Sequence, residues 1–336
     1  MKKYLDILVY GFASLVIIAI VLFSFGYGSR KVHRLCEHVI ELRIERQHQE
    51  KYALRHELKC NISQNVLITH KPDAWYKKYH VIRHAGGGID GKYYSGSLEA
   101  WDLSYERGNR VFDVDLSFTS DGVLVVRHGW SDNLEEDSLC AMAQSNINID
   151  ANGQLRYYKP YYRMNIEEFK QTKPFQSYTP LTCEDMINYM AVHSDLYVAL
   201  DMKDELLPSY KYLVKLASEM NLESTLQRMI VSVYDVEFYD SVMAIFPFDN
   251  WMLRQHYVDE RNYSLLISDC LSYNISAVNV SSCYADDEGI QWLNNAGIYT
   301  YVAVCDYISD MDIYHSKGFW GCVSNNLDEL VFDKYE

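Results

Sequence analysis

The chain has 336 residues, of which 49% are hydrophobic and 23% are charged, with only 6 prolines and 16 glycines. This composition excludes a disordered, collagen-like or linker-dominated chain, and the length suits one α/β barrel of roughly 250 residues with an N-terminal extension. Asp and Glu total 46 against 31 Lys and Arg, and the net charge of −15 argues against a nucleic-acid partner. An anionic substrate would therefore need a local cation.

The N-terminus is predicted to be a membrane anchor, residues 1–30. Residues 7–29 carry no charge and are long enough to span a bilayer, whereas a cleaved signal peptide usually has an apolar stretch of only about 7–15 residues. Lys2 and Lys3 favour a cytoplasmic N-terminus, although Arg30 and Lys31 favour the reverse. We expect a single-pass protein of the cell membrane, with the chain that follows the anchor outside the cytoplasm.

A helical stalk or linker is predicted over residues 31–78. Apolar residues at 32, 35, 39 and 42 follow a spacing of three and four, but two heptads are too few for a coiled coil. A solvated helix is the simpler interpretation.

The chain from residue 79 to 336 is predicted to be a (β/α)₈ TIM barrel. Short β-rich runs alternate there with helical stretches, as is typical of βα units around a parallel sheet. The predicted strands are Val81–His84, Val111–Phe118, Val123–His128, Leu196–Lys203, Met229–Val233, Asn250–Arg254, Ser276–Val280, Tyr299–Cys305 and Trp320–Ser324. The predicted helices are Ser97–Arg107, Cys183–His193, Ser209–Met220, Asp287–Ala296 and Met311–Lys317.

One of the nine strands is expected to be antiparallel. The connection of residues 119–122 is too short for a parallel crossover but suits a hairpin, so eight strands remain to close the barrel. Residues 129–180 fit no βα repeat and are expected to form an inserted lid or specificity loop.

Eight cysteines are present, without a Cys-x-x-Cys motif. A zinc ribbon or thioredoxin-type site is therefore not expected. Buried thiols are the favoured interpretation, and disulfides in an oxidising compartment are the alternative.

Two carboxylates mark the longest predicted strand. In residues 112–118 the alternation places Asp113, Asp115 and Ser117 on one face, and two like charges there are costly without a cation. The alternative is an exposed face of an edge hairpin. A turn centred between residues 120 and 121 would place Asp113 opposite His128, while His84 ends the first predicted strand.

A third carboxylate lies in a later strand, where Asp201 and Lys203 point to one side. Because barrel active sites form at the carboxyl ends of strands, Asp113, Asp115 and Asp201 could bind Mg²⁺ or Ca²⁺. Lys203 would contact a phosphate, or else form a salt bridge with Asp201. The glycines at 86–88 could let the backbone approach a ligand closely, or could mark only a turn.

The motifs together resemble the glycerophosphodiester phosphodiesterase family of TIM barrels. The resemblance rests on His84-Ala85-Gly86-Gly87-Gly88, Ser97-Leu98-Glu99-Ala100, Phe112-Asp113-Val114-Asp115 and Thr119-Ser120-Asp121-Gly122-Val123-Leu124-Val125-Val126-Arg127-His128. Weaker similarity continues through Leu200-Asp201-Met202-Lys203, Val231-Ser232-Val233-Tyr234 and Gly318-Phe319-Trp320-Gly321-Cys322-Val323-Ser324-Asn325.

The resemblance implies a metal-dependent enzyme that cleaves glycerophosphodiesters or related alcohol phosphodiesters. His84 and His128 would be the acid and base, Asp113, Asp115 and Asp201 would hold the divalent cation, and Lys203 would contact the phosphate. A hydrolase and a lyase that forms a cyclic phosphate are both consistent with this family.

The chain departs from the family pattern at several places. Ala85 stands where the family has Arg, and Asp113 and Asp201 stand where it has Glu. Residues 94–97 replace a Pro-Glu-Asn-Thr element. Toward the C-terminus, Trp-Thr-Val-Asn becomes Ala303-Val304-Cys305-Asp306, and Thr-Asp becomes Ser324-Asn325.

These departures favour a bulkier or polymeric diester over simple glycerol diesters. They also leave an alternative, in which a catalytically degenerate barrel binds lipid head groups or phosphate-containing polymers. Retention of both histidines and of the three carboxylates favours the enzyme.

Overall fold

The computed structural model describes residues 68–130, 147–149, 155–157, 163–255, 260–282, 285 and 287–335. The predicted anchor and residues 31–67 of the predicted stalk lie outside the described residues. Within the described ranges, no helix combines the length and the apolarity needed to cross a bilayer.

Eight parallel strands close into a barrel, as predicted. The main sheet has nine strands in the order β1-β11-β10-β9-β8-β7-β6-β2-β3, and pairing of β1 with β2 closes the ring, with antiparallel β3 added to β2. The strands are β1 (Val81–Arg83), β2 (Val111–Phe118), β3 (Leu124–Val126), β6 (Tyr197–Met202), β7 (Met229–Val233), β8 (Asn250–Gln255), β9 (Ala277–Ser281), β10 (Tyr299–Ala303) and β11 (Gly321–Ser324).

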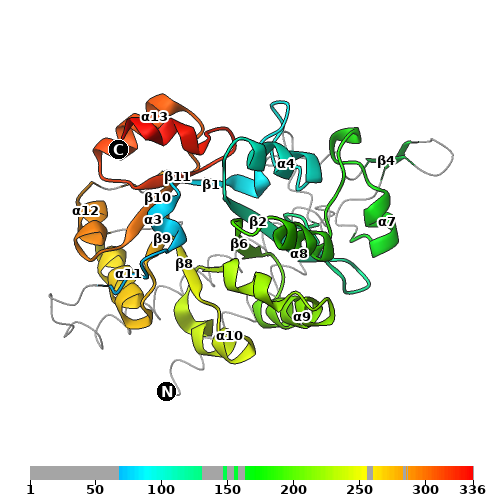
Figure 1. Cartoon of the computed structure of the whole chain (residues 1–336), viewed down its shortest axis with the longest axis horizontal. Helices are drawn as coiled ribbons and strands as arrows, with labels where there is room; N and C mark the ends of the chain where they lie inside the picture. Colours follow the sequence, from blue (N-terminus) through cyan, green and yellow to red (C-terminus); the bar gives the residue numbers. More distant parts are fainter. Residues whose placement is uncertain are drawn as a thin grey trace, which may run out of the picture. The chain divides into compact units, whose positions relative to one another are not determined.

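Helices surround this ring (Figure 1). They are α4 (Leu98–Glu106), α8 (Cys183–Val192), α9 (Leu206–Glu219), α10 (Tyr239–Ile245), α11 (Glu260–Tyr273), α12 (Asp287–Asn295) and α13 (Ile308–Ser316). Short 3₁₀ helices are η1 (His84–Gly86), η2 (Pro174–Gln176), η3 (Glu223–Arg228), η4 (Val236–Phe238) and η6 (Glu329–Lys334). The five helices named from the sequence are confirmed, and α10 and α11 were not among those named.

Local capping explains where two of these helices begin. The Ser97 side chain accepts a hydrogen bond from the backbone N–H of Ala100 at the start of α4. Thr182 and Asp185 form a reciprocal capping box at the start of α8. Such side chains satisfy N–H groups that have no partner within the helix.

An apolar layer fills the barrel at the amino ends of its strands. Each strand contributes one buried residue to this layer, namely Ile82, Val111, Ala199, Ile230, Met252, Ala277, Tyr301 and Val323. The short helix α3 (Trp75–Lys78) closes this end, where the Trp75 ring stacks on Tyr301 with 5.6 Å between centroids. The barrel interior is therefore a packed apolar core at the amino ends of the strands, and a functional site can form only at their carboxyl ends.

The β2–β3 hairpin is confirmed, but its predicted register is wrong by one residue. Leu116 pairs with Val126 and Phe118 with Leu124, so paired residue numbers sum to 242 rather than 241. The cause is a three-residue loop in which Gly122 adopts a left-handed φ of +81°. Asp113 therefore does not lie opposite His128, because a slip of one residue exchanges the two faces of a strand.

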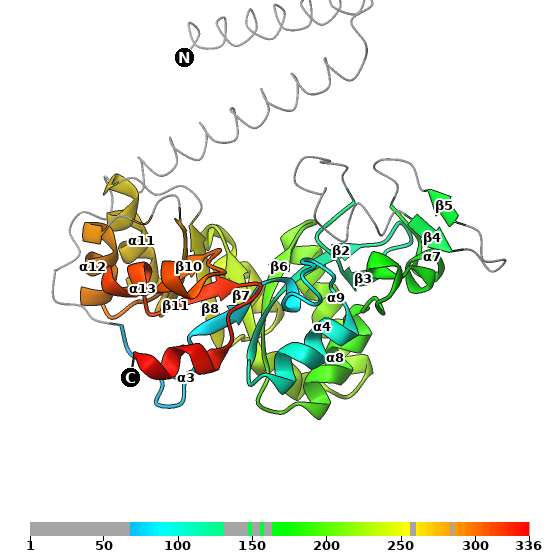
Figure 2. The same ribbon diagram turned by 90° about the horizontal axis from the view of Figure 1, so that it is seen from above.

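The predicted insertion contains its own secondary structure. Strands β4 (Ile147–Ile149) and β5 (Leu155–Tyr157) pair as a hairpin, and α7 (Ile166–Gln171) follows. Figure 2 shows β4, β5 and α7 beside β3, at the end of the molecule away from β10 and β11. The backbone N–H of Ser120 donates to the carbonyl of Met164, which ties the insertion to the β2–β3 turn.

Four cysteines lie in the described part of the chain: Cys183, Cys270, Cys305 and Cys322 are free thiols and buried. The prediction of buried thiols is confirmed for these four.

Candidate active site

A polar layer lies directly above the apolar layer of the barrel. Side chains alternate along a strand, so residues two positions further along also face inward. Those positions hold His84, Asp113, Asp201, Ser232, Arg254, Asn279, Ala303 and Asn325. All but Ala303 are polar, so seven of the eight strands contribute a polar side chain to this layer, either from within the strand or from the residue that follows it. One layer of the barrel therefore concentrates the groups that can do chemistry.

The three predicted carboxylates come together in this region. Asp115 on β2 is the direct neighbour of Asp201 on β6 in the parallel register, and Asp113 lies two residues earlier on β2. All three side chains are buried. The convergence of Asp113, Asp115 and Asp201 was predicted from strand alternation, and it needs the β2–β6 pairing to occur.

Two basic side chains bridge these carboxylates. Lys203 Nζ lies 2.9 Å from Asp115 Oδ1 and 2.8 Å from Asp201 Oδ2. Arg254 on β8 donates from Nη2 to Asp113, and its Nη1 lies 3.2 Å from Asp201 Oδ2. The predicted Asp201–Lys203 salt bridge is therefore present, and the contact of Lys203 with a phosphate stays a prediction.

Burial and charge act in opposite directions on these groups. Burial raises the pKa of Asp113 despite the nearby Arg254 guanidinium. Burial would also raise the pKa of Asp201, but Arg254 and Lys203 outweigh it and the pKa falls below its ordinary value. The pKa of Lys203 rises, because the attraction of Asp115 and Asp201 exceeds the effect of its burial. Both basic groups are thus held in their charged forms.

The carboxylates of this cluster are suitable ligands for a divalent cation, but basic side chains already contact their oxygens. Mg²⁺ and Ca²⁺ bind carboxylate oxygens, which three aspartates supply. However, Arg254 and Lys203 already contact oxygens of all three. A divalent ion about 4 Å from the guanidinium would be repelled by roughly 8 kcal/mol at an effective dielectric constant of about 20. Among the described residues, no group of three or more Asp, Glu, His or Cys side chains is arranged to hold a metal ion.

His84 follows β1 and is oriented by Asn325, which follows β11. His84 Nδ1 lies 3.1 Å from Asn325 Oδ1. The amide NH₂ of Asn325 donates to Asp306 at 2.9 Å, so the oxygen assigned to Asn325 is the atom that faces the histidine. An amide oxygen only accepts, and therefore Nδ1 of His84 carries the proton and Nε2 is the acceptor in the neutral ring.

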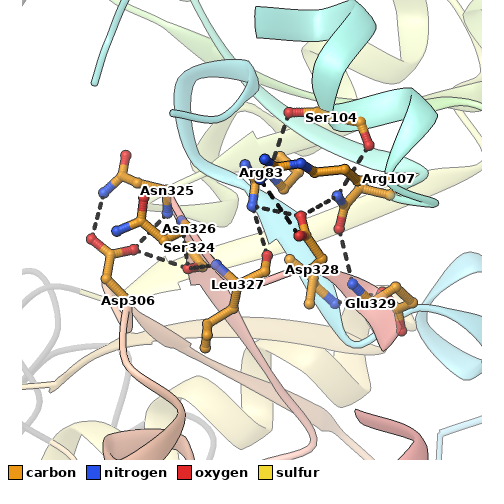
Figure 3. Close-up of polar contacts among 12 residues, drawn as sticks. Arg83, Ser104, Arg107, Asp306, Ser324, Asn325, Asn326, Leu327, Asp328 and Glu329 are labelled. Atoms are coloured by element: carbon orange, nitrogen blue, oxygen red, sulfur yellow. Dashed lines mark hydrogen bonds and ion pairs between the residues drawn. The ribbon is translucent and has the colours of Figure 1, made fainter. Parts of the chain in front are cut away.

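Asp306 holds the loop that carries Asn325 (Figure 3). Its carboxylate accepts from the Asn325 backbone N–H at 2.6 Å and from the Ser324 hydroxyl at 2.9 Å. The Ser324 hydroxyl in turn accepts from the backbone N–H of Leu327 at 2.9 Å, and the Leu327 carbonyl accepts from the buried Arg83 at 2.7 Å. This chain of contacts fixes the orientation of Asn325 and thus of His84.

His128 follows β3 and lies near the same cluster. The ring of Tyr94 contacts both histidines, with centroid separations of 4.6 Å to His84 and 5.6 Å to His128. The positive form of His128 also lowers the pKa of Asp201, although by less than Arg254 and Lys203 do. His128 thus reaches the site, although the register that predicted its partner was wrong.

The glycines after His84 serve packing. Gly86 has a φ of +81°, and a Cβ there would lie 2.2 Å from the Trp101 indole nitrogen. A Cβ on Gly87 would lie 2.3 Å from the Ser104 hydroxyl, and the Gly88 N–H donates to the Asn325 carbonyl. Of the two interpretations of this run, the tight turn is the one that these contacts support.

Sequence reasoning missed Ser232, Arg254, Asn279 and the Asn325–Asp306 pair as site components. Arg254 Nε donates to Ser232 Oγ at 2.5 Å, which joins β7 to β8 inside the layer. A signal was present, because each of Ser232, Arg254, Asn279 and Asn325 lies two residues after an inward apolar residue of its strand. Asp306 offers no such signal, since it follows β10 in a loop.

Several solved structures with the same fold are phosphodiesterases. A phosphodiesterase from Oleispira antarctica in complex with the product sn-glycerol-3-phosphate is 14% identical, with a TM-score of 0.57, covering 77% of this chain and 98% of that one. A glycerophosphoryl diester phosphodiesterase from Parabacteroides distasonis is 14% identical, with a TM-score of 0.55 and coverage of 81% and 88%. A glycerophosphodiester phosphodiesterase from Thermotoga maritima is 14% identical, with a TM-score of 0.52 and coverage of 77% and 98%.

At this identity the likeness shows the fold. No family model matches the chain. No curated protein matches it either.

Proposed function

We propose that this protein is a phosphoric diester hydrolase of the glycerophosphodiester phosphodiesterase type. The observation that carries the proposal is that Asn325 orients His84, while the Tyr94 ring contacts both His84 and His128 beside the buried carboxylates. The motif resemblance and the shared fold support it. The product in the Oleispira antarctica structure, sn-glycerol-3-phosphate, supports a small phosphodiester as substrate.

In this proposal His84 is the general base, because its Nδ1–H is fixed by Asn325 and its Nε2 is left to accept a proton. As the attacking oxygen forms its bond to phosphorus, its proton passes to His84. The bond to the leaving oxygen breaks, and His128 protonates the alkoxide. Lys203 contacts a phosphate oxygen. Attack by water gives hydrolysis, and attack by a neighbouring substrate hydroxyl gives a cyclic phosphate.

Replacing either histidine tests this assignment. We expect His84→Ala and His128→Ala in the full chain each to lower turnover at least about 100-fold, the lower end of general acid–base contributions. His193→Ala is the control, because His193 caps α8 at the opposite end of the barrel. Circular dichroism checks that each variant folds. Near-normal turnover of His128→Ala would contradict the acid–base pair.

A second candidate function is binding without cleavage. It is favoured by Ala85, which is buried and carries no charge where the family has Arg. A substrate screen distinguishes the two candidates: several glycerophosphodiesters and one larger diester are tested for both turnover and binding. Binding without turnover by the wild-type chain would favour this alternative.

We also propose that residues 7–29 anchor the protein in the membrane, with the barrel outside the cytoplasm. The uncharged run and Lys2 and Lys3 support this orientation. Protease added to intact cells should digest residues 60–336. Protection in intact cells, with digestion only after lysis, would reverse the orientation.

A further inference from the structure

Arg254 is a buried cation at the centre of the polar layer. It projects from β8, two residues after Met252 of the apolar layer, and is only 6% exposed. Its guanidinium contacts three side chains from three other strands: Asp113 on β2, Asp201 on β6 and Ser232 on β7.

The position of this guanidinium is the one a metal would need. Asp113 and Asp201 are two of the three residues that the family resemblance assigns to the divalent cation. Arg254 presents separate nitrogens to each of them, and its planar, permanently charged group suits such two-sided contact. Lys203 joins Asp201 to the third carboxylate, Asp115, in the same way.

Charge counting leads to the same result. Three carboxylates and two basic side chains leave a net charge of −1, and one protonated histidine brings the site to zero. A divalent ion added to this cluster would give it an excess positive charge beside a guanidinium. Without Arg254 the three carboxylates and Lys203 would total −2, which a divalent cation would neutralise.

We propose that Arg254 is the resident cation of this site, and that it replaces a divalent metal between Asp113 and Asp201. The guanidinium holds the two carboxylates together and, with Lys203, offsets most of the negative charge that a phosphodiester would otherwise meet. Cleavage then requires no divalent ion. The statement about cleavage rests on the proposed function, whereas the statement about metal binding does not.

The first experiment measures metal binding without reference to activity. Mn²⁺, Mg²⁺ and Ca²⁺ are titrated calorimetrically into the full-length wild-type chain and into Arg254→Met. We expect the wild type to bind each ion no more tightly than about 1 mM, the weak end of protein Ca²⁺ sites. Arg254→Met should bind at least tenfold more tightly, because it frees oxygens of Asp113 and Asp201.

Two further variants separate charge from side-chain shape. Arg254→Lys keeps the positive charge and should bind metal as weakly as the wild type. Arg228→Met makes the same substitution outside the site, where Arg228 donates to the carbonyls of Met190, His193 and Leu196, and should leave metal binding unchanged. If Arg254→Met fails to fold, the wild-type and Arg254→Lys titrations still decide.

The second experiment measures turnover in the presence of a chelator. Wild-type turnover should change less than twofold with EDTA, while Arg254→Met should lose activity and partly regain it with added Mn²⁺. Micromolar binding of one divalent ion by the wild type, with loss of turnover in EDTA, would overturn the proposal. Absence of turnover with every diester would instead count against the proposed function and leave the binding result standing.

Discussion

Two residues at the base of the candidate site exchange amide and carboxylate relative to the family pattern. The resemblance implies Asn after one strand and Asp after the next, whereas this chain has Asp306 and then Asn325. The structure pairs these two side chains, with the Asn325 amide nitrogen 2.9 Å from Asp306 Oδ2. Two apparent losses therefore fall on one pair of contacting side chains, in which amide and carboxylate are exchanged. In this chain the amide faces His84.

Restoring the family order tests this pairing. Asn325→Asp alone places two carboxylates in contact and should destabilise the fold, whereas Asp306→Asn with Asn325→Asp restores the contact. We expect a coupling free energy of about 0.5–3 kcal/mol, as is usual for residues in one hydrogen-bond network. Urea unfolding of the wild type, both single variants and the double variant gives this value. Additive effects of the two substitutions would contradict the pairing.

At the scale of elements, one glycine sets the register of the β2–β3 hairpin. Gly122 adopts a φ of +81°, and a Cβ built there meets no atom within 4 Å. Glycine is therefore favoured at this position by the left-handed backbone conformation and not by a lack of space for a side chain. The backbone N–H of Gly122 donates to the Thr119 carbonyl at 3.1 Å and that of Thr119 to the Val123 carbonyl at 2.8 Å. This loop determines which face of β3 points toward the barrel interior and where His128 is placed after the strand.

Substitution at Gly122 should therefore lower stability, and the loss should be larger for residues that rarely adopt a left-handed backbone conformation. We expect Gly122→Ala to lower the free energy of unfolding by about 1–2 kcal/mol, the usual cost of a left-handed residue with a Cβ. Gly122→Asn should cost less, because Asn tolerates this conformation. Ser120→Ala, in the same loop, should be near neutral. Equal stability of Gly122→Ala and the wild type in urea would show that the loop can change its conformation.

At the scale of the whole molecule, net charge and local charge oppose each other. The chain carries −15, yet its candidate site presents Lys203 and Arg254. A long-range negative field repels an anionic substrate, while short-range basic groups attract it. Salt screens the long-range field first, because the Debye length falls from about 30 Å at 0.01 M to about 3 Å at 1 M.

Salt should therefore accelerate the capture of anionic substrates. For a diester with one net negative charge, we expect kcat/KM to rise with ionic strength, by up to about tenfold, the lower end of electrostatic steering effects. A zwitterionic diester such as glycerophosphocholine serves as the control and should respond little. A fall in kcat/KM with salt for the anionic diester would show that the basic groups dominate at long range as well.

The sequence by itself determined most of the barrel. Short runs of apolar and β-branched residues identified all eight barrel strands and the antiparallel addition, because strands covered on both faces read as near-continuous apolar segments. Within the longest strand, the alternation of side chains placed Asp113 and Asp115 on one face. The helices α10 and α11 were not identified from the sequence. The insertion was recognised only as a departure from the repeat.

Only the tertiary structure decided which groups meet inside the barrel. Arg254 and Asp113 are 141 positions apart in the chain and lie on strands that are not neighbours in the sheet, so neither spacing nor strand pairing connects them. Closure of the sheet into a ring brings them together across its interior. The hairpin register likewise depended on one left-handed residue, which a hydrophobic pattern does not encode. Periodicity therefore specifies which face a side chain takes, and ring closure specifies its partners.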